Sequence, residues 1–415
     1  MRPSDEGRIA AFGPDARRRN FTVLGIRDPR PLAYALLGCA ALLWPGASQA
    51  APSLRVERVV VVMRHGVRAP IVGEAPEGTL TGAPWPTWPV PPEHLTPHGT
   101  KALEILGRAD RQWLAREGVL PARGCPAPSQ LRVWTNTAQR TIASGQAFAE
   151  GLAPGCGTPI GHLGPDQTDP LFEPLGAGVA PFDPAAAIAS IQAYTGGVDR
   201  LAARLKPQLD ELDRVLDCRA PQGCSPARPS KVLPSADGRG IDLTGPVRDA
   251  SGTAQVLLLQ YVEGLSPDRS NWRAVAPAAL KRVGALHAAL FDVFTRPPYM
   301  TARQAGPLGR RVLAALDAPE AGGVDVFMGH DTNVTALAAA LGVPLDAPSY
   351  ARGDVPPGGA LIFVGLKDKR GKRSVRVYYQ TQPLEALRRL DGRVTRSLVA
   401  VSLDDFRRRV AEVRE

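Results

Sequence analysis

Two short clusters of polar residues in this sequence combine the side chains that phosphoryl transfer needs. The first, Arg64-His65-Gly66-Val67-Arg68-Ala69-Pro70, places two guanidinium groups beside an imidazole. Arginine holds phosphate oxygens through its planar fork and stays charged, and a histidine nitrogen can attack phosphorus to form a covalent intermediate. We therefore identify His65 as the candidate nucleophile and Arg64 and Arg68 as candidate phosphate ligands. Gly66 would let the backbone approach the phosphate closely.

The second cluster is Gly329-His330-Asp331-Thr332-Asn333, at the start of a predicted helix. Helix N-termini favour anions. His330 could place positive charge near the transition state, and Asp331 could protonate the leaving alkoxide. Each cluster alone has an ordinary explanation, because a histidine after a strand is more often structural and Asp is a good helix N-cap. Together, each after an apolar strand, they form a far more specific pattern.

Strands are predicted directly before both clusters. Residues 55–63 end in a continuous run of Val and Met, and residues 324–328 are similarly apolar. Continuous β-branched runs are typical of strands buried on both faces of a sheet. Open α/β sheets bind ligands at the carboxyl ends of their strands. We therefore expect the two clusters to meet at one edge of a sheet.

The remaining pattern predicts an α/β fold with a central, mostly parallel sheet flanked by helices and an inserted helical cap domain. Further strands are expected at 131–134, 360–366 and 374–379, and helices at 97–117, 137–152, 185–217, 252–264 and 274–294. The composition shifts after about residue 174 toward Ala, Leu and charge. We accordingly predict an α/β domain from residues 51–175 plus 296–415, and a cap domain from residues 176–295.

The first 50 residues predict an export signal peptide. Five arginines between Arg17 and Arg30 precede an apolar run over residues 32–44, and Ala47-Ser48-Gln49-Ala50 supplies small residues for cleavage before Ala51. The apolar run is short for a transmembrane span, so we expect a periplasmic or secreted protein without stable membrane insertion.

Alternatives for this leader stay open. Residues 18–21 are similar to a twin-arginine motif, and residues 37–39 are similar to a lipoprotein cleavage site. A core helix of the fold, or a start assigned too far upstream, would also account for part of the pattern.

Cysteine usage agrees with export. Outside the leader the sequence contains Cys125, Cys156, Cys218 and Cys224, and an even set suits an oxidising compartment. Four cysteines allow three pairings. We expect neighbours to pair, Cys125 with Cys156 and Cys218 with Cys224, because the second pair closes a short loop containing Pro and Gly. The sequence has no Cys-x-x-Cys, so a zinc ribbon or redox motif is not expected.

Charge and composition narrow the function classes. Of the 415 residues, 44% are hydrophobic, which supports a sizeable buried core. The net charge is +10; the leader has seven Arg and four Asp or Glu, a net of +3, which leaves +7 outside it. No run of Lys and Arg is interleaved with aromatic residues, so nucleic-acid binding is not expected. No cluster has metal-ligand spacing, so no metal or cofactor is expected.

The two clusters resemble the signature of the histidine acid phosphatases, the branch of the histidine phosphatase superfamily that contains bacterial phytases and periplasmic glucose-1-phosphatase. The resemblance rests on Arg-His-Gly-x-Arg-x-Pro near the predicted mature start and His-Asp far downstream. It extends over nearly the whole mature chain. Other segments match in type and order: residues 85–90, 95–97, 139–141, 169–172 and 356–359.

The resemblance implies roles for six residues and a metal-independent site between an α/β domain and a helical cap. Arg64, Arg68 and Arg140 would hold the phosphate. His65 would be phosphorylated, His330 would bind the phosphate, and Asp331 would be the acid for the leaving group. Arg140 is implied by the resemblance alone, because an arginine early in a helix is usually a solvated surface charge.

Departures from the family bear on the substrate. Ile71-Val72 follow Pro70, where the phytase members tend to carry Thr and Lys, which weakens the case for a heavily phosphorylated inositol. Ala360 follows Gly358-Gly359 in place of a carboxylate. Residues 260–264 and the spacing of Cys218 and Cys224 look closer to the glucose-1-phosphatase members. The substrate therefore stays open between sugar phosphates and inositol phosphates.

Residues at the mouth of the site are less specific. Trp85 and Trp88 could stack on a sugar, or could simply pack within the Pro-rich loop of residues 76–97. Glu263 could line the cap side of the cleft. Four other histidines are expected to be surface or structural residues: His94, His98, His162 and His287.

The leading hypothesis is an exported acid phosphomonoesterase that acts on a small-molecule phosphomonoester through a phosphohistidine. One alternative is the mutase-like branch of the same superfamily. The export signal, the cysteines and an acid in the His330-Asp331 pair argue against it. The other alternative is a periplasmic phosphate- or sugar-phosphate-binding protein with a weak or inactive site.

Overall fold

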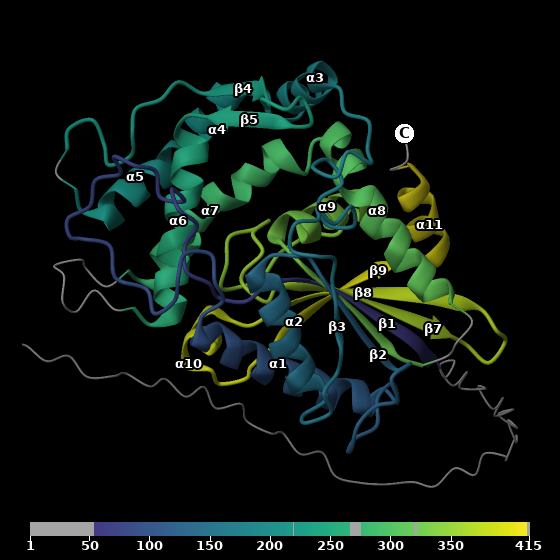
Figure 1. Ribbon diagram of the computed structural model, residues 1–415. Helices are drawn as coiled ribbons and strands as arrows, with labels where there is room; N and C mark the ends of the chain where they lie inside the picture. The colour runs from purple at the N-terminus through teal and green to yellow at the C-terminus, as the bar shows by residue number, and fades with distance from the viewer. Residues whose placement is uncertain (1–53, 219, 266–274, 319–321, 413–415) are drawn as a thin grey trace, which may run out of the picture. The chain divides into compact units, whose positions relative to one another are not determined.

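The computed structural model describes residues 54–218, 220–265, 275–318 and 322–412, so the predicted leader with Cys39 lies outside the described residues. Residues 51–415 form one compact unit. Its centre is a seven-stranded sheet in the order β3-β2-β6-β1-β7-β8-β9 (Figure 1). The strands are β1 (Arg55–Arg64), β2 (Leu131–Thr135), β3 (Ile160–Gly161), β6 (Val324–Gly329), β7 (Ala360–Lys367), β8 (Arg373–Thr381) and β9 (Thr395–Val401).

Most strands of this sheet run in one direction. β3, β2, β6 and β1 are parallel neighbours, whereas β7, β8 and β9 continue the sheet in antiparallel steps. Five of the seven strands therefore point the same way, because β8 is antiparallel to β7, which is antiparallel to β1. The predicted α/β class with a mostly parallel sheet is confirmed.

The valines of β1 explain why this strand lies at the centre. Val59 and Val61 pack on the side of α1 (Pro97–Arg116) and α2 (Gln139–Leu152). Val60 and Val62 pack on the opposite side, as successive strand residues must. Three helices cover that face, and Figure 1 shows them above the sheet: α8 (Pro298–Asp317), α9 (Asp331–Leu341) and α11 (Leu403–Glu412).

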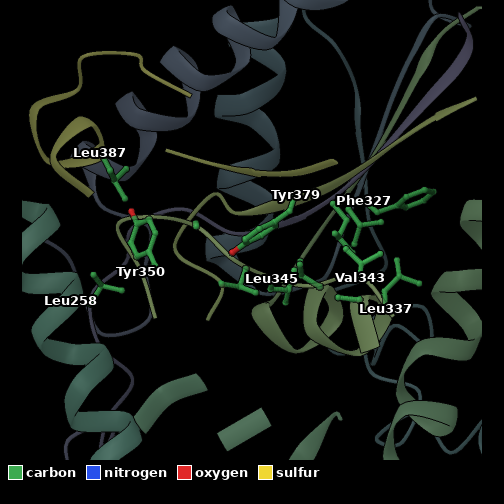
Figure 2. Close-up of a cluster of buried hydrophobic side chains, with 14 of the residues drawn as sticks. Leu258, Phe327, Leu337, Val343, Leu345, Tyr350, Tyr379 and Leu387 are labelled. Atoms are coloured by element: carbon green, nitrogen blue, oxygen red, sulfur yellow. The ribbon is translucent and has the colours of Figure 1, made fainter. Parts of the chain in front are cut away.

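The core on the second face also fixes the loop that follows α9. Figure 2 shows Phe327 of β6, Leu337 of α9 and Tyr379 of β8 in this cluster, together with Leu345 and Tyr350 from the loop. The Tyr379 hydroxyl donates a hydrogen bond to the carbonyl of Asp354 at 2.8 Å, and the Tyr350 hydroxyl donates to the carbonyl of Gln382 at 2.8 Å. Buried hydroxyl groups thus hold a segment that contributes to the site described below.

A largely helical segment lies between β3 and α8 in the sequence. It contains α3 (Pro184–Thr195), α4 (Val198–Arg204), α5 (Lys206–Leu216), α6 (Pro246–Glu263) and α7 (Pro277–Phe294), with a hairpin of β4 (Lys231–Pro234) and β5 (Ile241–Thr244). α6 packs against α7 and also contacts α10 (Leu384–Arg389). The domain boundaries at residues 175 and 296 stay a prediction. Among the described residues, no helix has the length and apolar character of a membrane span.

Several elements differ from the sequence prediction. The single helix expected over residues 185–217 is three helices, because Gly196 and Gly197 both have positive φ and end α3. The β4–β5 hairpin falls in a segment whose Pro, Ser and Gly content concealed it. The helix α8, the helix α10 and the carboxyl-terminal β9 and α11 were not predicted either. The short strand β3 was not predicted, and α6 begins six residues before the predicted start; the other predicted strands and helices match within a few residues at each end.

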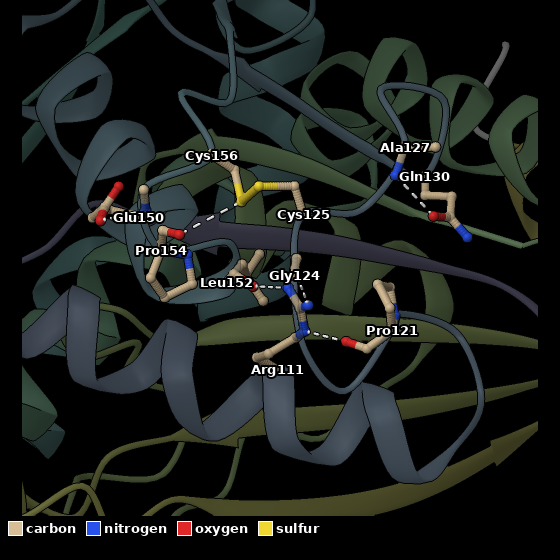
Figure 3. The surroundings of a disulfide bond; sticks show 11 residues. Arg111, Pro121, Gly124, Cys125, Ala127, Gln130, Glu150, Leu152, Pro154 and Cys156 are labelled. Atoms are coloured by element: carbon tan, nitrogen blue, oxygen red, sulfur yellow. Dashed lines mark hydrogen bonds between the residues drawn. A yellow bond between two sulfur atoms is a disulfide. The ribbon is translucent and has the colours of Figure 1, made fainter.

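Both predicted disulfides are present. Cys125 bonds to Cys156 across 31 residues, and Cys218 bonds to Cys224 across 6 residues. Figure 3 shows the first bond beside Arg111 of α1. The Arg111 guanidinium donates to the carbonyl of Pro121 at 2.7 Å and to the carbonyl of Gly124 at 2.8 Å, and also to that of Leu152. The arginine and the disulfide therefore tie the loop after α1 to the end of α2.

The two disulfides should differ in what they contribute to stability. In the chain-entropy description, the longer loop of Cys125–Cys156 constrains the unfolded chain more, by about 1.5 kcal/mol relative to Cys218–Cys224. We expect the double variant Cys125→Ser/Cys156→Ser to lose more free energy of unfolding in urea than the matched variant Cys218→Ser/Cys224→Ser. Equal losses, or a larger loss for the short loop, would contradict this ranking.

Candidate active site

Three neighbouring parallel strands end at one edge of the sheet, and polar residues follow each of them. Arg64 of β1 lies opposite Gly329 of β6, and the next residue, His65, donates its backbone N–H to the Gly329 carbonyl at 3.0 Å. On the other side of β6, Asn136 follows β2 and donates its backbone N–H to the Met328 carbonyl at 3.0 Å. Strand pairing thus brings together the two clusters that are far apart in the sequence.

His65 is buried, with 3% of its surface exposed. Its Nδ1 lies 2.9 Å from the carbonyl oxygen of Gly66, a contact that places the ring proton on Nδ1 and leaves Nε2 with a free electron pair. Burial, and then the charges of Arg64 and Arg68, hold the pKa of His65 well below its usual value. The imidazole is therefore neutral, as a nucleophile must be.

Gly66 is explained by packing rather than by approach to a phosphate. A Cβ at this residue would lie 2.7 Å from Cδ1 of Leu103 and 3.0 Å from Cδ1 of Leu95. The backbone N–H of Gly66 donates to Oγ of Ser144 at 3.0 Å. Because Gly66 has no side chain at this point, the loop can pack closely against Leu103 of α1.

Arg64 is the most enclosed of the three arginines. It is 1% exposed, and its guanidinium donates to the carbonyl of Val355 and to Oε1 of Gln255. Its Nη2 also lies 3.0 Å from Oδ2 of Asp331. Contacts from three separate segments therefore fix the orientation of this group.

Arg68 and Arg140 each pair with a carboxylate that the sequence analysis missed. Both Nη atoms of Arg68 donate to the carboxylate of Glu74, each at 2.7 Å. Burial opposes the charge of Arg68, but the hydrogen bond and charge of Glu74 outweigh it and raise its pKa. Arg140 Nη1 lies 3.0 Å from Oε2 of Glu93. Glu93 has a φ of 69°, a left-handed conformation that costs energy for a residue other than glycine.

All three arginines keep one donor without a partner. The Nε atoms of Arg64, Arg68 and Arg140 are buried and have no hydrogen-bond acceptor in the part of the chain that the structure describes. Buried donors normally have acceptors. All three side chains lower the pKa of His65 through their charge, after burial, so all three charges act on this one ring. Oxygen atoms of an anion at His65 would supply the missing acceptors.

His330 lies beside His65, with the ring centroids 5.6 Å apart. Its Nε2 is 2.8 Å from Nδ2 of Asn136, whose Oδ1 accepts from the backbone N–H of Thr137 at 2.7 Å. That second contact orients the amide, so Nε2 of His330 is the acceptor. Burial, followed by the charge of Arg140, lowers the pKa of His330 to about 3. His330 is therefore neutral in this site, where the sequence analysis expected it to carry positive charge.

Asp331 is the first residue of α9, and its Oδ1 accepts from the backbone N–H of Thr332 at 2.8 Å. Burial alone would raise its pKa, but the charge of Arg64, the largest opposing cause, prevails and lowers it to about 2. The carboxyl group is consequently ionised in the free site from mildly acidic pH upward.

His287 of α7, which the sequence analysis expected to be a surface or structural residue, lies buried next to the site. It is 6% exposed, and its Nδ1 lies 2.8 Å from Oδ1 of the buried Asp354. Its Nε2 lies 3.7 Å from Oδ2 of Asp331. The sequence feature that could have indicated its burial is its place next to Leu286 on the buried face of an apolar helix.

The residues predicted at the mouth lie in two different places. Trp88 lines a pocket together with Ile71 and Val72. Glu263, at the end of α6, instead accepts from Oγ1 of Thr96 at 2.6 Å, and burial raises its pKa. Within the described ranges, no three or more His, Cys, Asp or Glu residues are grouped so as to hold a metal ion.

Sequence comparison relates the chain to known phosphatases. A family profile described as the histidine phosphatase superfamily (branch 2) matches residues 55–222. Phytase AppA of Escherichia coli strain K12 is 34% identical over 341 residues, which cover 76% of this chain and 78% of that protein. A glucose-1-phosphatase of Providencia rettgeri is 29% identical over 349 residues, which cover 80% of this chain and 82% of that protein.

Structural comparison gives the same relationship. The apo form of Hafnia alvei phytase superimposes with a TM-score of 0.79 at 29% identity, covering 88% of this chain and 98% of that one. A phytase from Klebsiella sp. ASR1 gives a TM-score of 0.78 at 27% identity, covering 87% and 96% of the two chains. Together with the arginines and histidines gathered at the sheet edge, these likenesses show that the chain is a phosphatase and belongs to branch 2 of the histidine phosphatase superfamily.

Proposed function

We propose that this protein is an exported acid phosphomonoesterase that transfers the phosphoryl group of a sugar phosphate or inositol phosphate to His65 and then to water. The observation that carries this proposal is the set of three buried Nε donors of Arg64, Arg68 and Arg140 around a neutral imidazole. A phosphoryl group in transfer spreads negative charge over its oxygens. Donors fixed in advance around that position stabilise it without reorganisation.

The reaction divides into two steps. In the first, Nε2 of His65 attacks phosphorus, the P–N bond forms, and the P–O bond to the alcohol breaks, while the proton that the substrate monoanion brings passes by way of Asp331 to the leaving oxygen. In the second, water attacks phosphorus, the P–N bond breaks and inorganic phosphate forms, with Asp331 accepting the proton of the water. Asp331 is positioned for both roles because Arg64 and α9 hold it beside the histidine pair.

Export is supported by two independent features. The leader of residues 1–50 has the basic, apolar and small-residue sections of a signal peptide. The four cysteines that follow it form two disulfides, which persist in oxidising compartments such as the periplasm.

Trapping the covalent intermediate tests the proposal. Mature protein is mixed with p-nitrophenyl phosphate, quenched in base, because phosphohistidine is acid-labile, and digested for mass spectrometry. We expect one phosphoryl group on the peptide containing His65, and neither label nor hydrolysis in His65→Ala. The matched variant His162→Ala removes an exposed histidine outside the site and should behave as the unaltered protein.

The outcomes separate the alternatives. Hydrolysis that survives in His65→Ala would eliminate this residue as the nucleophile. Binding of inorganic phosphate without hydrolysis of any monoester would identify a binding protein with an inactive site.

The role of Asp331 as acid predicts a dependence on the leaving group. Asp331→Asn keeps the size and the acceptor for Thr332 but cannot donate a proton in the same way. We expect kcat/KM for ethyl phosphate to fall about 100-fold or more, and kcat/KM for p-nitrophenyl phosphate to fall much less, because nitrophenolate leaves without protonation. The control Asp292→Asn changes a carboxylate that pairs with Arg296. Equal losses on both substrates would show that Asp331 acts only structurally.

The low pKa of Asp331 predicts the form of the pH profile. Because the free carboxyl is ionised above about pH 2, the proton for the leaving group must arrive with the substrate monoanion. A phosphate monoester loses that proton with a second pKa of about 6. His65 stays neutral at acid pH, so it imposes no loss there. Activity should therefore be retained below pH 6 and fall about tenfold for each pH unit above it.

Two related substrates test this assignment. Replacing ethyl phosphate by trifluoroethyl phosphate lowers the second pKa of the substrate, so the descending limb of kcat/KM should move to lower pH by the same amount. A limb that stays at one pH for both substrates would mean that a protein group titrates there, and would contradict the ionised Asp331.

A further inference from the structure

An apolar pocket of about 390 Å³ opens next to the arginine that follows the nucleophile. One wall is the stretch Ala69 to Gly73, which directly follows Arg68. The opposite wall is α6, through Val256 and Gln260. Gln255 of the same helix accepts a hydrogen bond from Arg64. The pocket is therefore lined by residues that directly follow Arg68 and Gln255 in the chain, and its volume lies within the usual range for small-molecule sites.

The lining of this pocket is aromatic and apolar. Trp85 and Trp88 form part of it, and Ile71 and Val72 stand at its edge with 36% and 81% of their surface exposed. Large apolar side chains so exposed beside a pocket are candidates for contact with a ligand. Among the described lining residues none carries a charge.

One lining residue offers an unused polar group. Gln260 is 7% exposed, and its Nε2 is buried without an acceptor in the described part of the chain. A buried amide without a partner is costly. An oxygen atom on a ligand in the pocket would satisfy it.

The loop of residues 69–75, which forms the wall next to Arg68, is held in place by contacts with α6 and by Glu74. A Cβ on Gly252 of α6 would lie 1.9 Å from the carbonyl oxygen of Glu74, so only glycine lets the helix and this loop meet. Glu74 then holds both Nη atoms of Arg68. Arg68 and Glu74, the charged residues next to this wall in the sequence, are thus paired with each other, and the lining residues include no cation.

We propose that this pocket binds the alcohol part of the substrate, and that it selects an uncharged ring with an apolar face and a hydroxyl or ether oxygen. The apolar face would lie against Trp88, and the oxygen would accept from Nε2 of Gln260. This inference rests on the proposed function. It assigns the substrate to ring-containing monophosphates such as hexose phosphates, and it disfavours polyphosphorylated inositols, because further phosphates would be desolvated here without a cation.

Two substrates with the same type of leaving group test whether the pocket binds a ring. Ethyl phosphate and cyclohexylmethyl phosphate are both esters of primary alcohols, so they differ in the ring and little in the chemistry. We expect kcat/KM to be about 30-fold higher for the ring compound, equivalent to about 2 kcal/mol of apolar burial. Inositol hexakisphosphate should give a lower kcat/KM than a hexose 6-phosphate.

Variants locate the effect in the pocket. Trp88→Ala should remove most of the 30-fold preference, measured as the ratio of kcat/KM for cyclohexylmethyl phosphate to kcat/KM for ethyl phosphate. Gln260→Leu should lower about tenfold the ratio of kcat/KM for the hexose 6-phosphate to kcat/KM for cyclohexylmethyl phosphate. The control Tyr194→Ala removes a half-exposed aromatic side chain of α3 that is not part of this pocket and should change neither ratio.

A second variant keeps the proposal testable if Trp88→Ala fails to fold. Val72→Lys adds a cation at a highly exposed residue, so the fold is retained, and kcat/KM for inositol hexakisphosphate should rise about tenfold at low salt. Hydrolysis of ethyl and cyclohexylmethyl phosphate with equal kcat/KM would overturn the pocket assignment and leave the phosphatase proposal standing. Hydrolysis of neither, with no label on His65, would instead overturn the proposed function itself.

Discussion

The burial of three guanidinium groups around one imidazole is the constraint on which the rest of the site depends. Charges removed from water are tolerated only when they are paired and hydrogen-bonded. Here each arginine has its own carboxylate: Arg64 has Asp331, Arg68 has Glu74, and Arg140 has Glu93. The pairs balance the charge of the free site, and the net effect on both histidines is to keep them neutral. An incoming phosphate therefore meets donors that are already oriented and a nucleophile that is already deprotonated.

The helix α6 connects the phosphate site to the selection of the alcohol. Within three turns it supplies Gly252 against the Glu74 loop, Gln255 to Arg64, and Val256 and Gln260 to the apolar pocket. The helical segment between β3 and α8 thus contributes side chains both to the phosphate site and to the pocket. A change in this helix that tilts it by a small amount would alter the orientation of Arg64 and the shape of the pocket together.

The sequence predicted the features that depend on local pattern, and missed those that depend on how distant segments meet. The strands before His65 and His330 were identifiable from their apolar runs, and both polar clusters followed from position at the strand ends. The role of Arg140 as a phosphate ligand was predicted only from the family resemblance, because nothing in the pattern of its own helix indicates that role. Glu74 and Asn136 were missed because their contacts arise only when a loop and a strand end meet residues from distant parts of the chain. The β4–β5 hairpin was concealed by a composition typical of loops.

The position of β1 has a consequence for when the site can exist. This strand, which carries Arg64, pairs only with β6 and β7 in the sheet, and those begin at residues 324 and 360. A chain that emerges from its amino end, at a ribosome or at a translocation pore, therefore holds its nucleophile in an unpaired segment until most of the polypeptide has followed. Catalytic competence appears late and all at once. A chain that ends before β6 and β7 therefore lacks the assembled site.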